Sequence, residues 1–215
     1  MQTIALFHVF VAREDVRQVL QFDCMKLFLG IDTHCEAGYN FGELGLSDPT
    51  TIANNVCTWK GIVCGNGLIS SIHWSLHYRH HFYNFNWLPS TLQEILLQKQ
   101  PVQPCPINTR LLPRNSNSIS IVSCNLIGPL NMRGLPYLLE SLCLRHNMLV
   151  GIIDLTHLPE SIQCIDLSFN LFTEILVRSS SLPKTLFEVR GGKAKPNWLE
   201  GPIDRRVRTD MLGPI

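Results

Sequence analysis

The sequence predicts an α/β-type repeat solenoid, in which short parallel strands stack along one side and a helical segment covers the amino-terminal end. Two observations predict this class. The dipeptide Leu-Pro recurs every 23 or 24 residues, starting at positions 88, 112, 135, 158 and 182. Between these pairs an apolar pattern, which we call the template, recurs, with apolar side chains at positions +0, +3, +5 and +10. In the clearest unit +0 is Ile162, and position +8 is an asparagine, Asn170. Such a unit cannot bury its apolar side alone, so neighbouring units must stack.

The unit from Leu158 to Leu176 shows the template most clearly. Ile165 and Leu167 alternate around Asp166, so in an extended segment both point to one face. Asn170 follows where the strand must bend, and a buried amide there can bond backbone groups that lack ladder partners. We call this +8 site the ladder position. Along the chain it is occupied by His77, Gln100, Cys124, Asn147 and Asn170.

Two of these units carry a family resemblance. The segments "LESLCLRHNMLVGII" and "ESIQCIDLSFNLFTEIL" resemble leucine-rich repeats of the LxxLxLxxN/CxL type. Gly128 and Gly151 resemble the plant-like subclass, and the style of the repeats is similar to protist surface proteins of the same family. The resemblance spans residues 57–192. It implies a horseshoe with the strands on its concave face and an irregular or turn-rich convex side.

Residues 1–67 are predicted to form the amino-terminal cap. Residues 13–30 are expected to form a helix whose buried face carries Val16, Val19, Leu20 and Leu27. The segment "NNVCTWKGIVC" is similar to the CxWxGVxC cap of plant-type leucine-rich repeat proteins. That resemblance implies a disulfide between Cys57 and Cys64. The residues alone also allow two reduced structural cysteines.

Residues 68–192 are expected to hold about six repeats with degenerate ends, and residues 193–215 an irregular cap or tail. The pairing of three further cysteines stays open at this stage, namely Cys24, Cys35 and Cys105.

Catalytic chemistry is not expected. His73, His77, His80 and His81 cluster in sequence, but the repeat register spreads them over different faces, so no metal site is predicted. Cys143 lies near His146 in sequence and near Cys164 on the neighbouring strand, but an open sheet offers no enclosed pocket for a Cys–His dyad. No cofactor motif is present, and a metal- or cysteine-dependent enzyme is a minor alternative.

The expected function is binding of a protein or peptide on the concave sheet face, where side chains such as Asp166 and Phe169 should point away from the core. The alternative is a truncated or decoy family member without a ligand of its own. The predicted partner-binding residues are His73, Leu96, Lys99, Ser120, Cys143, Arg145, His146, Asp166, Ser168, Phe169 and Arg190.

Charge and hydropathy narrow the class of partner. A net charge of +1 argues against nucleic acid as the main partner. No apolar stretch is long enough to predict membrane insertion. The cap resemblance favours a secreted or cell-surface protein because disulfides belong to oxidising compartments, and a cytoplasmic location is the alternative. The sequence leaves the oligomeric state open.

Overall fold

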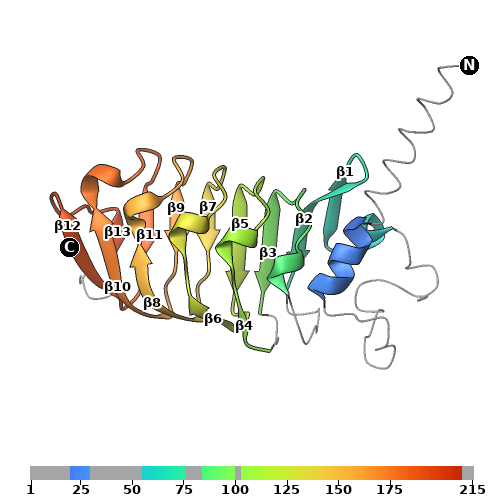
Figure 1. Ribbon diagram of the computed structural model, residues 1–215, viewed down its shortest axis with the longest axis horizontal. Helices are drawn as coiled ribbons and strands as arrows, with labels where there is room; N and C mark the ends of the chain where they lie inside the picture. Colours follow the sequence, from blue (N-terminus) through green and yellow to red (C-terminus); the bar gives the residue numbers. More distant parts are fainter. Residues whose placement is uncertain (1–19, 30–54, 76–83, 100–102, 210–215) are drawn as a thin grey trace, which may run out of the picture.

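A long sheet of mainly parallel strands runs the length of the described molecule, and a second, shorter sheet accompanies its later repeats, so that the chain forms a solenoid-like stack (Figure 1). The computed structural model describes residues 20–29, 55–75, 84–99 and 103–209. The first sheet has eight strands, in the order β1 (Ile62–Gly65), β2 (Leu68–Trp74), β3 (Glu94–Gln98), β5 (Ser118–Val122), β7 (Ser141–Cys143), β9 (Cys164–Asp166), β11 (Glu188–Arg190) and β13 (Val207–Arg208). β1 pairs with β2 antiparallel, and the later neighbours pair in parallel.

The second sheet is a feature that the sequence did not predict. It has five strands, in the order β12 (Lys195–Glu200), β10 (Leu171–Arg178), β8 (Met148–Asp154), β6 (Leu126–Pro129) and β4 (Cys105–Pro106). The far side of the solenoid is therefore more regular than the expected turn-rich surface. Extended chain continues after the ladder positions at Cys124, Asn147 and Asn170. In the last of these repeats Ile175 and Val177 alternate and return to the core.

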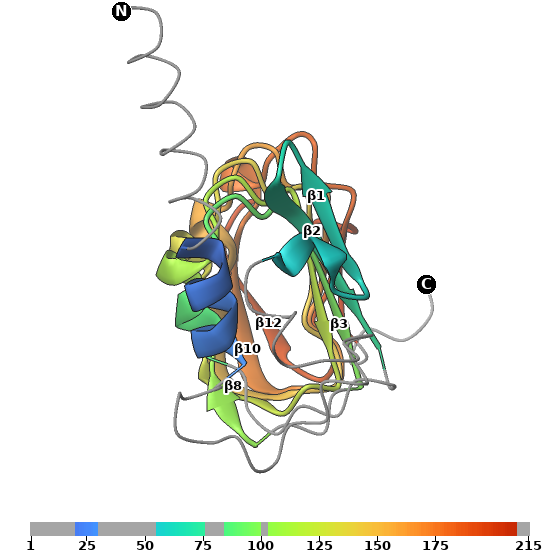
Figure 2. The ribbon, with the colours of Figure 1, turned by 90° about the vertical axis from the view of Figure 1, so that its right-hand side faces the viewer.

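Short 3-10 helices line the same side as the second sheet, opposite the eight-stranded sheet (Figure 2). They are η4 (Phe85–Trp87), η5 (Thr109–Leu111), η6 (Met132–Gly134), η7 (Leu155–His157) and η8 (Ser179–Ser181). Four of the five begin with an Asn or Asp whose side-chain oxygen accepts a hydrogen bond from the backbone N–H two residues later. This capping satisfies a donor that the helix start leaves unpaired. The capping residues are Asn84, Asn108, Asn131 and Asp154.

The core lies between the two sides and follows the predicted template. In the parallel strands of the first sheet the inward residues are almost fully buried, for example Ile95 and Leu97 in β3 and Ile119 and Ile121 in β5. Burying one such side chain stabilises the fold by about 1.5–3 kcal/mol. One inward site in the repeat that contains β5 is polar: Ser116 is fully buried, and its hydroxyl donates to the carbonyl of Leu92 in the preceding repeat.

The ladder position joins neighbouring repeats through backbone groups. Asn147 is 7% exposed, and its Oδ1 accepts hydrogen bonds from the N–H groups of Cys124 and Leu126. Its Nδ2 donates to three backbone carbonyls, those of Ile121, Leu144 and Arg145. Asn170 repeats the pattern one unit later but is only half-buried. Cys124 is fully buried at the same site. His77 and Gln100 lie outside the described residues.

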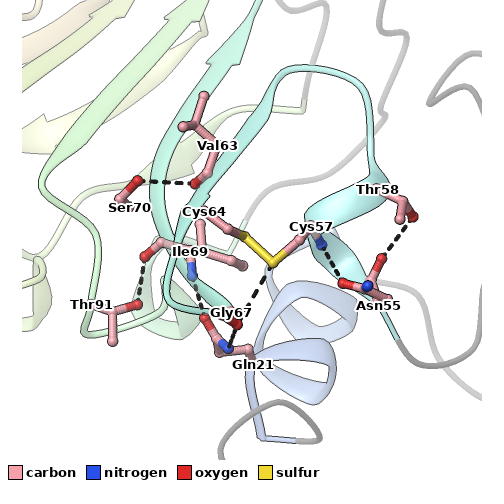
Figure 3. Close-up of a disulfide and its surroundings, with 10 residues drawn as sticks. All are labelled: Gln21, Asn55, Cys57, Thr58, Val63, Cys64, Gly67, Ile69, Ser70 and Thr91. Carbon is pink, nitrogen blue, oxygen red and sulfur yellow. Dashed lines mark hydrogen bonds between the residues drawn. A yellow bond between two sulfur atoms is a disulfide. The ribbon is translucent and has the colours of Figure 1, made fainter.

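The amino-terminal end of the core is covered by a helix, of which residues 20–28 are described, and by the segment around η3 (Val56–Thr58). Cys57 and Cys64 are joined by a disulfide, as Figure 3 shows. Gln21 donates to the carbonyl of Gly67 and accepts from the N–H of Ile69, so the helix bonds directly to the backbone around the start of β2. Trp59 is 2% exposed and meets Phe22 edge to face.

The predicted buried face of this helix is wrong in its described part. Leu20 and Leu27 are 56% and 44% exposed. The buried face instead carries Gln21, Met25 and Phe28, with Leu29 just beyond the helix. The cause is Gln21, a polar residue that is buried because it bonds the backbone beside β2. Val16, Val19 and Cys35 lie outside the described residues.

At the carboxy-terminal end, residues 195–208 add one strand to each sheet. Arg206 holds this end in place, since its Nη1 donates to the carbonyls of Pro183 and Leu186 in the preceding repeat. Asp204 orients the guanidinium through hydrogen bonds from Nε and Nη2. Donation from Arg206 holds the pKa of the Asp204 carboxyl below its ordinary value, although partial burial opposes this.

Candidate functional site

The outward side chains of the eight-stranded sheet and of the turns that follow its strands form one surface, which we call the strand surface. Its central row comes from consecutive cross-strand neighbours: His73 lies beside Leu96, Leu96 beside Ser120, and Ser120 beside Cys143. The row continues to Asp166 and Arg190. The predicted register therefore places these six side chains side by side along the solenoid.

The side chains of the row differ in how far they are exposed to solvent and so to a partner. His73 and Arg190 are exposed, whereas Leu96, Ser120 and Cys143 are half-buried. His73 Nε2 lies 2.9 Å from a carboxylate oxygen of Glu94. Arg190 lies 2.9 Å from Glu188, which also contacts Arg208 at 3.3 Å.

Asp166 departs from the expectation that it points freely away from the core. It is 9% exposed, and its Oδ1 accepts hydrogen bonds from both the backbone N–H and the hydroxyl of Ser168. These bonds shape the turn after β9. We therefore assign Asp166 to supporting that turn rather than to direct contact with a partner.

A second row lies directly before the ladder position, where each residue adopts a left-handed backbone conformation. Lys99, Ser123, His146 and Phe169 have φ angles of 51°, 56°, 55° and 56°. Residues other than glycine rarely adopt this conformation because Cβ crowds the backbone. Lys99, His146 and Phe169 are exposed, so three large side chains stand out in a fixed row. The sequence carried no signal for this row, since none of these positions holds glycine.

Arg145, His146 and Phe169 form a cluster within this surface. The rings of His146 and Phe169 stack with centroids 4.2 Å apart and planes 5° apart. The guanidinium carbon of Arg145 lies 5.8 Å from the centre of the Phe169 ring. Its Nη2 lies 3.3 Å from Nε2 of His146. Phe169 nevertheless remains 59% exposed, so its ring is held in place while still open to contact.

An open hollow of about 510 Å³ adjoins this cluster. Arg145 and His146 form part of its wall, and Cys143 and Ser120 contribute from the central row. Its remaining lining residues are Gln98, Lys99, Val122 and Ser123. The hollow thus brings together residues from three repeats, six of which belong to the predicted partner-binding set or directly precede a ladder position.

The thiols on this surface are poor candidates for nucleophiles. Partial burial raises the pKa of Cys143, and burial likewise raises the pKa of Cys164 on the neighbouring strand, with Glu188 adding to the effect. The thiolate is the reactive form, so a raised pKa lowers reactivity at neutral pH. Burial also raises the pKa of Cys105 to about 11. Within the described residues no group of three or more potential metal ligands converges.

A second open hollow, of about 720 Å³, lies on the opposite side beside η7 and η8. Its wall includes His157, Glu160 and Lys184, together with hydroxyl groups such as Thr156 and Thr185. It contains none of the predicted partner-binding residues. This second hollow is the alternative docking site to the strand surface.

The fold and surface define a solenoid with two sheets and a row of fixed, outward side chains. Within the described ranges, none of the helices has the length and hydropathy needed to cross a bilayer. No family model matches the chain, and no curated protein matches it. Among solved structures it is similar to the crystal structure of a pollen receptor kinase 3, with 19% sequence identity and a TM-score of 0.40. That likeness covers 70% of this chain and 81% of the other, and is too distant to assign a family.

Proposed function

We propose that this chain is a leucine-rich repeat module that binds a protein or peptide on its strand surface without catalysing a reaction. The observation that carries this proposal is the cluster of Arg145, His146 and Phe169, which holds an exposed aromatic ring beside a hollow. Aromatic and arginine side chains dominate the energetics of protein interfaces. Fixing them before association lowers the ordering cost of binding.

The cap supports an extracellular setting for this role. The disulfide between Cys57 and Cys64 favours an oxidising compartment, so we propose a secreted or cell-surface location. The proposed division places the amino-terminal cap in residues 1–67 and the repeats in residues 68–192, with residues 193–215 closing the stack.

Selection from a random peptide display library against the whole chain tests the proposal. Peptides that bind the wild type should lose at least about tenfold in affinity for the Phe169→Asn variant, because a central aromatic anchor is removed. Asparagine is chosen because it tolerates a left-handed backbone better than alanine does.

Phe187→Asn is the matched control. Phe187 is 61% exposed, close to the 59% of Phe169, but directly precedes β11 and is not part of the cluster. Peptides that bind the Phe169 variant as tightly as the wild type would contradict the proposal. So would peptides whose binding falls only with a change in the second hollow, such as Glu160→Ala.

A further inference from the structure

The hollow beside Phe169 is basic. Among the described residues that line it, Lys99 and Arg145 carry positive charge, and none is an aspartate or a glutamate. Ser120, Ser123 and Gln98 add neutral polar groups to the same wall. The acid next along the central row, Asp166, accepts its hydrogen bonds from Ser168. An oxyanion entering this hollow would meet donors and positive charge.

The two strongest cations of this hollow lack carboxylate partners within the described chain. Several other arginines pair with acids: Arg133 with Asp154, Arg178 with Glu200, and Arg190 and Arg208 with Glu188, whereas Arg114 donates to backbone carbonyls. Neither Lys99 nor Arg145 lies within ion-pair distance of a described carboxylate. The guanidinium of Arg145 is instead held by an aromatic face and an imidazole nitrogen.

Arg145 also has an unsatisfied donor. Its Nε is buried and has no hydrogen-bond partner among the described residues. Buried polar groups in folded proteins are nearly always hydrogen-bonded, and Trp59 Nε1 and Thr209 Oγ1 are the other exceptions among the described residues. The planar guanidinium fork matches a carboxylate in two parallel hydrogen bonds.

From these observations we propose that the hollow is an anion subsite that takes a side-chain or terminal carboxylate of an acidic peptide segment. This inference rests on the proposed function, because it specifies the ligand of the same surface. Arg145 and Lys99 bind the carboxylate, and Phe169 packs against an apolar side chain next to it. The ligand it fits is therefore an extended segment in which an acidic residue adjoins an apolar one.

Cys143 provides a built-in reporter, since its thiol is free and lines the hollow. Methyl methanethiosulfonate, a small neutral thiol reagent, can be applied to the non-reduced chain, and each cysteine followed by peptide mass mapping. Hexaglutamate should slow modification of Cys143 several-fold, while hexaserine and hexalysine should not. Cys164 serves as the internal control, because it faces the same surface but lies beside Glu188 and is not part of the hollow.

The variant Lys99→Gln/Arg145→Gln should lose this protection. The matched control is Lys184→Gln/Arg133→Gln, which removes two exposed cations away from the hollow and should keep it. The charge of the hollow can also be probed without a peptide, by comparing thiol reagents of opposite charge. The anionic sulfonatoethyl reagent should modify Cys143 faster, relative to the cationic trimethylammonioethyl reagent, in the wild type than in the Lys99/Arg145 variant.

The possible results separate failure of the anion subsite from failure of the proposed function. Equal protection of Cys143 by hexaglutamate and hexaserine, or protection that persists in the Lys99/Arg145 variant, overturns the anion subsite. Protection by inorganic phosphate with none by hexaglutamate assigns the hollow to a small phosphate and overturns the peptide ligand. Selected peptides that depend on Phe169 but carry no acidic residue overturn this inference alone. Hexaglutamate protection without any Phe169-dependent peptide overturns the proposed function and leaves the subsite standing.

Discussion

His146 and Phe169 stack face to face although they belong to different repeats, with ring centroids 4.2 Å apart and planes 5° apart. Each occupies the left-handed position directly before a ladder asparagine, and the stack follows from that shared geometry. The backbone that positions the two rings is fixed by Asn147 and Asn170, whose side chains bond backbone groups of their own turn and of the preceding repeat. The buried ladder and the exposed cluster are therefore two sides of one repeated turn.

The stack should contribute measurably to stability. Aromatic pairs of this kind contribute about 0.5–1.5 kcal/mol beyond their buried area. A double-mutant cycle with His146→Asn and Phe169→Asn, followed by urea unfolding, should give a coupling free energy at the lower end of this range, because both rings are exposed. Additive effects of the two changes would show that the rings do not interact in solution.

The ladder asparagines should differ in how much they stabilise the fold. Asn147→Ala should lower the free energy of unfolding by about 1–3 kcal/mol, because the N–H groups of Cys124 and Leu126 lose a buried acceptor. Asn170→Ala should cost less, since Asn170 is only half-buried and water can replace part of its bonding. Chemical denaturation measures both, with the exposed Asn117→Ala as control. An unchanged midpoint for Asn147→Ala would refute the structural role.

The cap disulfide should add modest stability. It closes a loop with a sequence separation of 7 residues, for which loop-closure entropy predicts about 2–3 kcal/mol. Replacing both Cys57 and Cys64 by serine should lower the unfolding free energy by that amount. Intact-mass measurement after alkylation, with and without reductant, tests the bond itself. Free alkylation of both thiols in protein isolated under oxidising conditions would count against the cap and the extracellular location together.

Acid should loosen the carboxy-terminal end. The pKa of Asp204 is lowered below its ordinary value of 3.8, chiefly by donation from Arg206. A lowered folded-state pKa contributes stability that is complete above the ordinary value and is lost as pH falls through the lower one. The backbone N–H groups of Val189 and Gly191 donate to the backbone carbonyls of Arg206 and Arg208. Below pH 3.8 these two amides should therefore lose protection from hydrogen exchange.

The variant Asp204→Asn separates this local effect from general acid unfolding. It should show weaker protection of the same two amides at neutral pH and a smaller further loss on acidification. Asp154, whose pKa is also lowered by Thr156 and Arg133 despite the opposing effect of burial, acts on a different repeat. Protection at Val189 that follows pH identically in the wild type and in Asp204→Asn would exclude the proposed role of Asp204.

The sequence predicted the parallel strands of the first sheet from β2 to β11 best, because a strict repeat forces apolar side chains such as Ile165 and Leu167 to one face. It did not predict β1 and β13, which lie in the expected cap and in the expected irregular tail. The second sheet was missed because the template ended near position +10, although Ile175 and Val177 continue the alternation in the same repeat. The Asn and Asp residues that cap the 3-10 helices could have been predicted from the sequence. Four of the five Leu-Pro pairs have such a residue four positions before the leucine, as Asn131 lies four before Leu135.

Other features could not have been read from the sequence. The buried face of the first helix depends on Gln21, whose burial follows from bonds to backbone that no hydrophobic pattern reveals. The left-handed row has no glycine to mark it. The burial of Asp166 depends on its bonds to Ser168 in the following turn. Predictions from periodicity placed residues on the correct face of the sheet, but did not show which of them are free to contact a partner.

The central claim is that the strand surface binds the partner. Chemical-shift mapping of the isotope-labelled chain with a peptide selected by display tests it most directly. The account predicts that the largest shifts fall on Lys99, Cys143 and Phe169, which lie at and beside the hollow, and that those of Lys99 and Cys143 vanish in Phe169→Asn. Shifts confined to His157, Glu160 and Lys184, on the opposite side of the solenoid, would contradict it.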